Sequence, residues 1–196
     1  MTGRPRKFDE GKALDAAIKI FWANGYEGAA YSALSKAMKM NRPSIYGAFG
    51  DKEGLFLRVV DRYTELHTYP ALAKLNEGAS YRDGFDLFFQ AMIKNMVNKH
   101  HAGCLISTVL CEATYVSPKF EAKLKNIVSA IDSFLRTRLQ RAIDDGELPK
   151  EVDALMIARI LNNNLNGLAL RARAHEKEEN LVALAQASLD AVLLAA

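Results

Sequence analysis

The chain has 196 residues, of which 49% are hydrophobic and 25% charged, and its formal net charge is +3. These values are ordinary for a soluble globular protein, either one large domain or a small domain on a larger body. No apolar run approaches the length of a membrane span, and the polar start of the chain does not resemble a signal peptide. We therefore expect a cytoplasmic protein with no membrane partner.

Positive charge is concentrated at the start of the chain. Residues 1–60 contain ten Lys and Arg against six Asp and Glu, whereas the remainder contains sixteen against seventeen. Arg4, Arg6 and Lys7 lie within the first seven residues, which contain no acidic residue. A short basic arm ahead of a first helix suits contact with DNA phosphates or the minor groove. A frayed, solvated terminus is the alternative.

Helical periodicity dominates the chain, and strand-like alternation is nearly absent. Asn41, Asp51 and Ser80 are the expected N-caps of three of the helices. The predicted helices are, in chain order, one that ends at Asn24-Gly25, then Ser32–Met38, Arg42–Phe49, Lys52 to a break at Tyr69-Pro70, Arg82 to about Asn98, Cys104 to about Tyr115, Ser117-Pro118 to Asp145-Gly146, Glu151–Ala174 and Glu178–Leu194. The sequence predicts an all-α fold of about nine helices.

The first three helices have the lengths and spacing of a helix-turn-helix unit, whose last helix enters the major groove of DNA. Leu34, Ala37 and Met38 would face inward from the second helix, and Ile45 and Phe49 would anchor the third. The polar and small residues of the third helix would then face outward. Arg and Asn side chains bond guanine and adenine edges, and Gly or Ala permits close approach to the groove.

Sequence motifs for catalysis and for cofactors are absent. The chain has no CxxC, phosphate loop, GxGxxG or HExxH motif. We expect no enzyme activity, no cofactor and no metal site. The rival hypothesis is an all-α ligand carrier or enzyme that uses the N-terminal helices only as a scaffold.

A set of motifs in the first part of the chain resembles the DNA-binding domain of TetR-type bacterial transcriptional regulators. The most diagnostic spacing is Tyr46, Phe49, Lys52 and Leu55. The other matching segments are Ala13–Ala17, Phe21, Gly25-Tyr26-Glu27-Gly28, Leu34-Ser35-Lys36-Ala37-Met38, Ser44-Ile45-Tyr46 and Asp51-Lys52-Glu53-Gly54-Leu55-Phe56. The resemblance covers residues 7–67 closely, with the helix-turn-helix at 30–49, and the remainder matches only in helix number and length.

This resemblance implies a DNA-binding head over residues 1–50, joined by a linking helix to a ligand-binding and dimerisation body over residues 51–196. The protein would be a repressor released from its operator by a small-molecule or redox signal. Arg42 and Ser44 are the expected base-reading residues, and Tyr46 and Lys52 would contact phosphates. The other expected DNA-binding residues are Arg4, Arg6, Lys7, Ala30, Tyr31, Ser32, Asn41, Pro43 and Gly47.

The turn between the second and third helices departs from the family pattern. The position usually filled by Gly is Lys39. If Lys39 has a positive φ, its side chain costs about 1 kcal/mol relative to Gly. The alternative is a turn of slightly different geometry.

By resemblance, the expected partners are a palindromic double-stranded operator, a second copy of the chain and an unknown small-molecule inducer. The dimer would form through the last two helices. A stripe rich in small residues suits such a contact, although an ordinary internal face is the alternative. Its members are Leu181, Leu184, Ala185, Ser188, Leu189, Val192 and Leu193.

The residues of a ligand pocket are harder to assign. An aromatic and thioether face at Phe85, Phe88 and Met92 suits a cavity wall, with plain core as the alternative. Four Asn residues, three of them consecutive, fall within one predicted helix, so some of them should bond a ligand, the backbone or a partner. The pocket predicted from these features consists of Phe85, Phe88, Met92, Cys104, Thr108, Asn163 and Asn166.

Cys104 is a candidate redox or electrophile sensor. The run Gly103-Cys104-Leu105 resembles a segment of family members that sense through a cysteine, and His100 and His101 precede it. Cys104 and Cys111 would lie about 10.5 Å apart on one helix, too far for a disulfide within the chain. The alternative is that both cysteines are small buried apolar residues.

Overall fold

The computed structural model describes residues 8–97, 102–110 and 117–194, and every regular element in these ranges is helical. When α4 and α5 are counted as one continuous rod, these residues form nine helical rods, which confirms the all-α prediction. No helix within the described ranges is long and apolar enough to cross a membrane. Arg4, Arg6, Lys7, His100, His101 and Cys111 lie outside these ranges.

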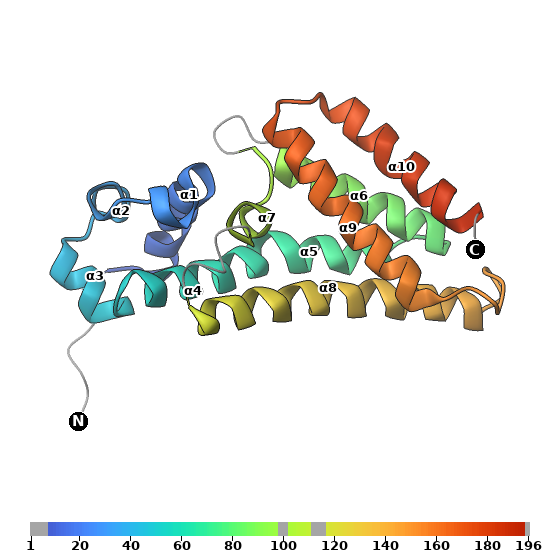
Figure 1. Cartoon of the computed structure of the whole chain (residues 1–196), viewed down its shortest axis with the longest axis horizontal. Helices are drawn as coiled ribbons and strands as arrows, with labels where there is room; N and C mark the ends of the chain where they lie inside the picture. The colour runs from blue at the N-terminus through green and yellow to red at the C-terminus, as the bar shows by residue number, and fades with distance from the viewer. Residues whose placement is uncertain (1–7, 98–101, 111–116, 195–196) are drawn as a thin grey trace.

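The first three helices form the N-terminal head (Figure 1), which consists of α1 (Glu10–Gly28), α2 (Tyr31–Met38) and α3 (Arg42–Phe49). Asp9 caps α1 by accepting a hydrogen bond from the Lys12 backbone N–H. Gly25 has φ 72°, outside the helical range, so the regular part of α1 ends where the Asn24-Gly25 pair predicts. Residues 26–28 form one further turn.

A long helical rod runs from the head into the body. It consists of α4 (Lys52–Tyr63), the π-helical turn η1 (Thr64–Thr68), α5 (Tyr69–Ala73) and the 3-10 turn η2 (Lys74–Asn76). The predicted break at Tyr69-Pro70 is wrong. Pro70 lies in the first turn of α5, where a missing N–H is tolerated. In the wider π turn just before it, the Tyr69 N–H donates to the Thr64 carbonyl, and the rod continues through the proline.

The remaining helices form the body, in which α8 extends beside the α4–α5 rod and α9 crosses between α8 and α10 (Figure 1). Their bounds are α6 (Tyr81–Met96), α7 (Leu105–Leu110), α8 (Pro118–Asp144), α9 (Ala154–Arg173) and α10 (Glu178–Leu194). Ser80 forms a capping box with Asp83 at the start of α6, as the sequence predicts for its N-cap. Helices α6, α8, α9 and α10 therefore begin and end within a few residues of their predicted limits, whereas the predicted end of the helix from Cys104, near Tyr115, lies outside the described residues.

Head and body share one hydrophobic core. The Phe56 ring of α4 stacks on Phe120 of α8, with ring centroids 4.8 Å apart, and meets Phe21 of α1 edge-on at 4.9 Å. All three rings are fully buried. On α8, Leu135 belongs to this core, whereas its neighbour Phe134 is 48% exposed.

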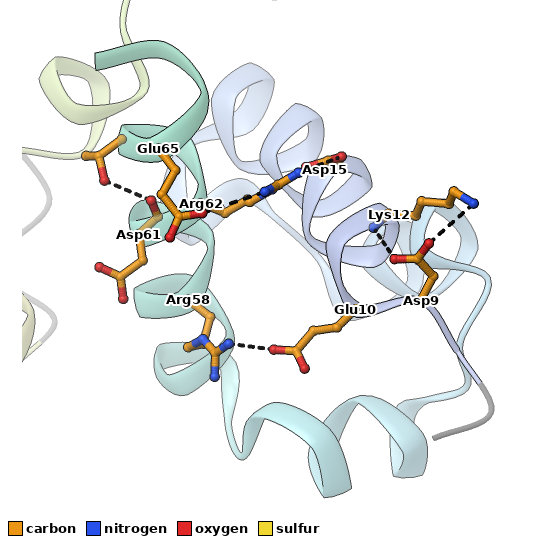
Figure 2. A network of polar contacts seen from close by, with 9 residues as sticks. Asp9, Glu10, Lys12, Asp15, Arg58, Asp61, Arg62 and Glu65 are labelled. Carbon is orange, nitrogen blue, oxygen red and sulfur yellow. Dashed lines mark hydrogen bonds and ion pairs between the residues drawn. The ribbon is translucent and has the colours of Figure 1, made fainter. Parts of the chain in front are cut away.

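Ion pairs hold α1 against α4 at the surface of the head (Figure 2). Arg58 bonds Glu10 at 2.5 Å, and Arg62 bonds Asp15 at 2.8 Å. Both pairs are partly exposed, so each contributes at most about 1 kcal/mol. The two pairs place opposite charges side by side along α1 and α4, whose packing already depends on the buried rings. They thereby help to set how the head is oriented on the rod.

Candidate nucleic-acid interface and body cavity

Helix α3 is amphipathic in the way a recognition helix requires. Ile45 and Phe49 are buried beneath it, whereas Arg42 and Ser44 are exposed and Tyr46 is 61% exposed. Pro43 and Gly47 also lie on the exposed side. The structure thus brings the predicted DNA-binding residues of α3 onto one outward face, with the apolar residues below it.

Asn41 is the N-cap of α3, as predicted, and its side-chain oxygen accepts a hydrogen bond from the Ser44 backbone N–H at 2.9 Å. This bond stabilises the first turn of the helix that carries the outward face. The amide oxygen is therefore engaged within the protein. Asn41 is exposed, and its NH₂ group remains as the donor for an outside partner.

Helix α2 supports α3 from the side. The guanidinium of Arg42 lies 4.6 Å from the centroid of the Tyr31 ring, a cation–π contact that links the two helices. Burial raises the pKa of Tyr31, and the nearby Arg42 charge opposes this rise. Both residues belong to the DNA-binding set predicted from the sequence. Their contact was not predicted, because the turn between the helices brings together residues eleven positions apart.

The start of α2 faces outward without a side-chain cap. Ala30 is its N-cap residue and has no group to bond the first N–H groups, and both Ala30 and Ser32 are exposed. Free N–H groups at a helix N-terminus attract phosphates. Tyr31, by contrast, is only half-exposed because its ring covers part of the head.

Lys39 ends α2 with φ 54° and ψ 38°, in the left-handed region, so the strain anticipated for a non-Gly residue is present. The Lys39 and Met40 N–H groups bond the Lys36 and Ser35 carbonyls, which closes the end of α2. The Ser35 hydroxyl also donates to the Met40 carbonyl. The tight turn is therefore held by several bonds, although it lacks the usual glycine.

Lys52 is tied back to the head. Its ammonium lies 4.8 Å from the centroid of the Tyr26 ring and donates to the Glu27 carbonyl at 3.3 Å. Desolvation, followed by nearby carboxylates, raises the pKa of Tyr26 to about 12, so this ring remains neutral under the Lys52 charge. Lys52 thus links α4 to the last turn of α1, a contact that sequence spacing did not indicate.

Three of the seven predicted pocket residues line a cavity, and the other four do not. Phe85, Phe88 and Met92 are 0%, 1% and 7% exposed, which corresponds to the alternative of plain core. Cys104, Thr108 and Asn166 instead line a cavity of about 280 Å³ between α7 and α9. Asn163 is exposed on α9 and is not part of its wall.

Arg173 and Gly103, which were not among the predicted pocket residues, also shape this cavity. Arg173 lines it from the last turn of α9. Gly103 has φ 88°, and a Cβ there would lie 3.0 Å from the Ala169 carbonyl oxygen, so only Gly lets the loop before α7 approach α9 this closely. Cys104 itself is buried and accepts a hydrogen bond from the Tyr63 hydroxyl at 3.5 Å.

The Asn run of α9 is used mainly for packing. Asn162 is buried, and its amide donates to the Val128 carbonyl at 3.2 Å and to the Asp132 carboxylate at 2.6 Å. Asn166 accepts from the Ser107 hydroxyl at 2.8 Å at the cavity wall. These bonds to α8 and α7 account for two of the four amides.

The stripe proposed as a dimer contact on α10 is largely internal. Leu181, Ala185 and Leu189 are buried within the single chain, where α10 packs on α6 and α9. The period of 3.6 residues identifies a buried face but not what buries it. The large apolar residues that α9 and α10 leave exposed are Met156, Ile160, Leu170 and Leu184.

Comparisons with known proteins agree with this architecture. Residues 13–59 match the family model "Bacterial regulatory proteins, tetR family", and residues 86–188 match "Tetracyclin repressor-like, C-terminal domain". The HTH-type transcriptional repressor ComR of Escherichia coli K12 is 31% identical over 95% of this chain and 90% of its own length.

This chain belongs to the TetR family. It is a helix-turn-helix transcriptional regulator, as the sequence predicts, and family membership makes double-stranded operator DNA and a second copy of the chain its partners. The AcnR repressor of Corynebacterium glutamicum is 26% identical over 86% of this chain and 84% of its own length. A cysteine mutant of the TetR family regulator CifR, solved with 26-bp operator DNA, is 32% identical, with a TM-score of 0.86 over 96% of this chain and 99% of that one.

Proposed function

We propose that this protein is a repressor that reads a palindromic operator with the exposed face of α3. The observation that carries this proposal is the placement of Arg42, Ser44 and Tyr46 outward over buried Ile45 and Phe49. Arg42 and Ser44 would contact base edges, and Tyr46 would donate a hydrogen bond to a phosphate. The relatives named ComR and AcnR are repressors, which supports repression rather than activation.

The start of α2 would provide further backbone contacts. Ala30, Tyr31 and Ser32 bring N–H groups that suit a phosphate, and Lys52 would add positive charge beside them. The remaining members of the proposed DNA-binding set are Asn41, Pro43 and Gly47, with Arg4, Arg6 and Lys7 on the N-terminal arm. These contacts would set affinity, whereas Arg42 would set sequence preference.

We infer that repression is relieved by a signal received in the body. The head would comprise residues 1–50 and the body residues 51–196, and the protein would act in the cytoplasm without enzyme activity. The cavity beside Cys104 supports a small-molecule signal, and the buried Cys104 thiol keeps a redox signal as the second candidate. The dimer would form through α9 and α10, at the face that exposes Met156, Ile160, Leu170 and Leu184.

The test is a fluorescence anisotropy titration of the protein with the intergenic DNA upstream of its gene. We expect salt-dependent binding with Kd of about 10⁻⁸ M or tighter at physiological salt, and much weaker binding to a scrambled duplex. Promoter activity in a reporter should rise when the gene is deleted. Equal affinity for operator and scrambled DNA, or no change in the reporter, would contradict the proposal.

A further inference from the structure

Arg173 connects the body to the end of the first helix. It lies at the last position of α9, and its Nη1 donates to the Trp22 carbonyl at 3.3 Å and to the Thr108 hydroxyl at 3.0 Å. Its Nη2 donates to the Ala23 carbonyl at 3.4 Å. One guanidinium therefore holds α1 of the head, α7 and α9 together.

The carbonyls that Arg173 contacts lie beside an irregularity in α1. Gly25, which follows Trp22 and Ala23 closely, leaves the helical conformation, and the regular part of the helix ends there. A cation at a helix C-terminus also offsets the negative end of the helix dipole. No carboxylate of the described residues lies within ion-pair distance of Arg173, so its charge meets only neutral oxygens.

The same guanidinium forms part of the wall of the 280 Å³ cavity. The other polar groups of the wall are already paired, because Ser107 donates to Asn166 and the Thr108 hydroxyl donates to the Cys104 carbonyl. Leu170 and Ala169 supply apolar wall. Arg173 is the one charged residue among the residues that line the cavity, and it carries the donors best suited to a new acceptor.

We propose that this cavity binds a small carboxylate with an apolar body, and that the carboxylate takes the Arg173 donors away from the carbonyls of α1. This inference rests on the proposed repressor function and adds the ligand class and the residue that transmits its binding. A carboxylate is a stronger acceptor for a guanidinium than a neutral carbonyl, and it can accept two parallel bonds. Loss of the Arg173 bonds frees the head from one of its attachments to the body.

The binding step is tested without DNA, by isothermal titration calorimetry with octanoate and with its uncharged analogue octanamide. We expect octanoate to bind at least tenfold more tightly than octanamide. Arg173→Met should abolish this difference and Arg173→Lys should reduce it, because an ammonium cannot hold a carboxylate in the same two-bond geometry. Arg171→Met is the matched control, since Arg171 lies two positions away on α9 and pairs with Glu176 outside the cavity.

The transmission step is tested by operator titrations with and without octanoate. We expect octanoate to weaken operator binding at least tenfold in the wild type and in Arg171→Met. Arg173→Met should bind operator more weakly from the start and show no further response, with an unchanged circular dichroism spectrum. Equal binding of octanoate and octanamide, or a full response of Arg173→Met, would overturn the inference. Failure of the untreated protein to bind any operator would instead contradict the proposed function. The calorimetry would still test whether the cavity binds a carboxylate through Arg173.

Discussion

At the scale of single residues, Arg42 and Tyr46 occupy the same exposed face of α3 but have different surroundings. Arg42 packs over the Tyr31 ring, which limits the directions its guanidinium can take. Tyr46 is 61% exposed, one turn further along the helix. An oriented guanidinium suits paired bonds to a guanine edge, whereas an exposed phenol suits a single bond to a phosphate.

The two side chains should therefore fail in different ways when changed. Arg42→Ala should cost about 1–3 kcal/mol of operator binding and should relax sequence preference. Tyr46→Phe removes only a hydroxyl, so it should weaken binding to operator and to scrambled duplex by a similar factor. Anisotropy titrations with both duplexes measure this. A larger loss of specificity for Tyr46→Phe than for Arg42→Ala would reverse these assignments.

Lys39 tests the strain in the turn between α2 and α3. Its φ of 54° is unfavourable for a side chain with a Cβ, so Lys39→Gly should stabilise the protein by up to about 1 kcal/mol. The greater freedom of Gly in the unfolded chain offsets part of this gain. Lys36→Gly, inside α2, is the control and should destabilise by about 1 kcal/mol. Urea unfolding compares them, and equal destabilisation by both changes would show that the turn is not strained.

At the scale of elements, helix ends show which local signals suffice. Asn41, Asp51 and Ser80 each accept a backbone N–H bond in the first turn that follows, so these starts are set by neighbouring residues alone. Pro70 misled the prediction because a π turn upstream accommodates it. Thr64 and Thr68 of that turn are buried polar residues, and the local sequence signals used in the prediction did not indicate a π turn there.

The exposed apolar face of α9 and α10 gives a prediction at the same scale. Ile160 on α9 is 38% exposed, so its own chain does not cover it fully. Ile160→Glu should therefore shift the dimer to monomer, because a carboxylate buried in an apolar interface is costly. Leu87→Glu on α6, where Leu87 is 37% exposed, is the matched control and should remain dimeric. Light scattering after size exclusion measures the mass, and a dimeric Ile160→Glu protein would exclude this face.

At the scale of the whole molecule, a buried aromatic cluster joins head and body beside the Arg173 contact. Trp22 of α1 meets Tyr63 of α4 edge-on at 5.0 Å and His67 of η1 at 5.4 Å. Burial raises the pKa of Tyr63 well above its ordinary value, and burial lowers the pKa of His67. Both groups are therefore held neutral where the two parts of the chain meet.

The lowered pKa of His67 makes this joint sensitive to acid. As pH falls below about 6.5, the unfolded chain takes up a proton at His67 more readily than the folded chain, so stability falls until the pH passes the lower folded pKa. His67→Phe should lose less stability than the wild type between pH 7.5 and pH 5. The exposed His175→Gln serves as control and should follow the wild type. Urea unfolding across this range measures the slopes, and parallel wild-type and His67→Phe curves would contradict the assignment.

The amino-acid sequence by itself determined the helical fold, most helix limits and the outward face of α3. Each of these depends on residues within one or two turns of each other, through periodicity, caps and the spacing of Tyr46, Phe49, Lys52 and Leu55. The resemblance also marked Lys39 as a departure from the usual Gly, but it left open whether Lys39 has a positive φ, and the structure gives φ 54°.

The tertiary structure decided the features that depend on distant packing. An apolar stripe has the same sequence pattern whether its own chain or a partner covers it. Only the packing of α6, α9 and α10 shows that Leu181 and Phe85 belong to the core of the single chain. Likewise, the meeting of Arg173 with Trp22 joins residues 151 positions apart. No local pattern specifies such a contact, because it depends on how the packing of α1 and α9 brings the ends of these two helices together.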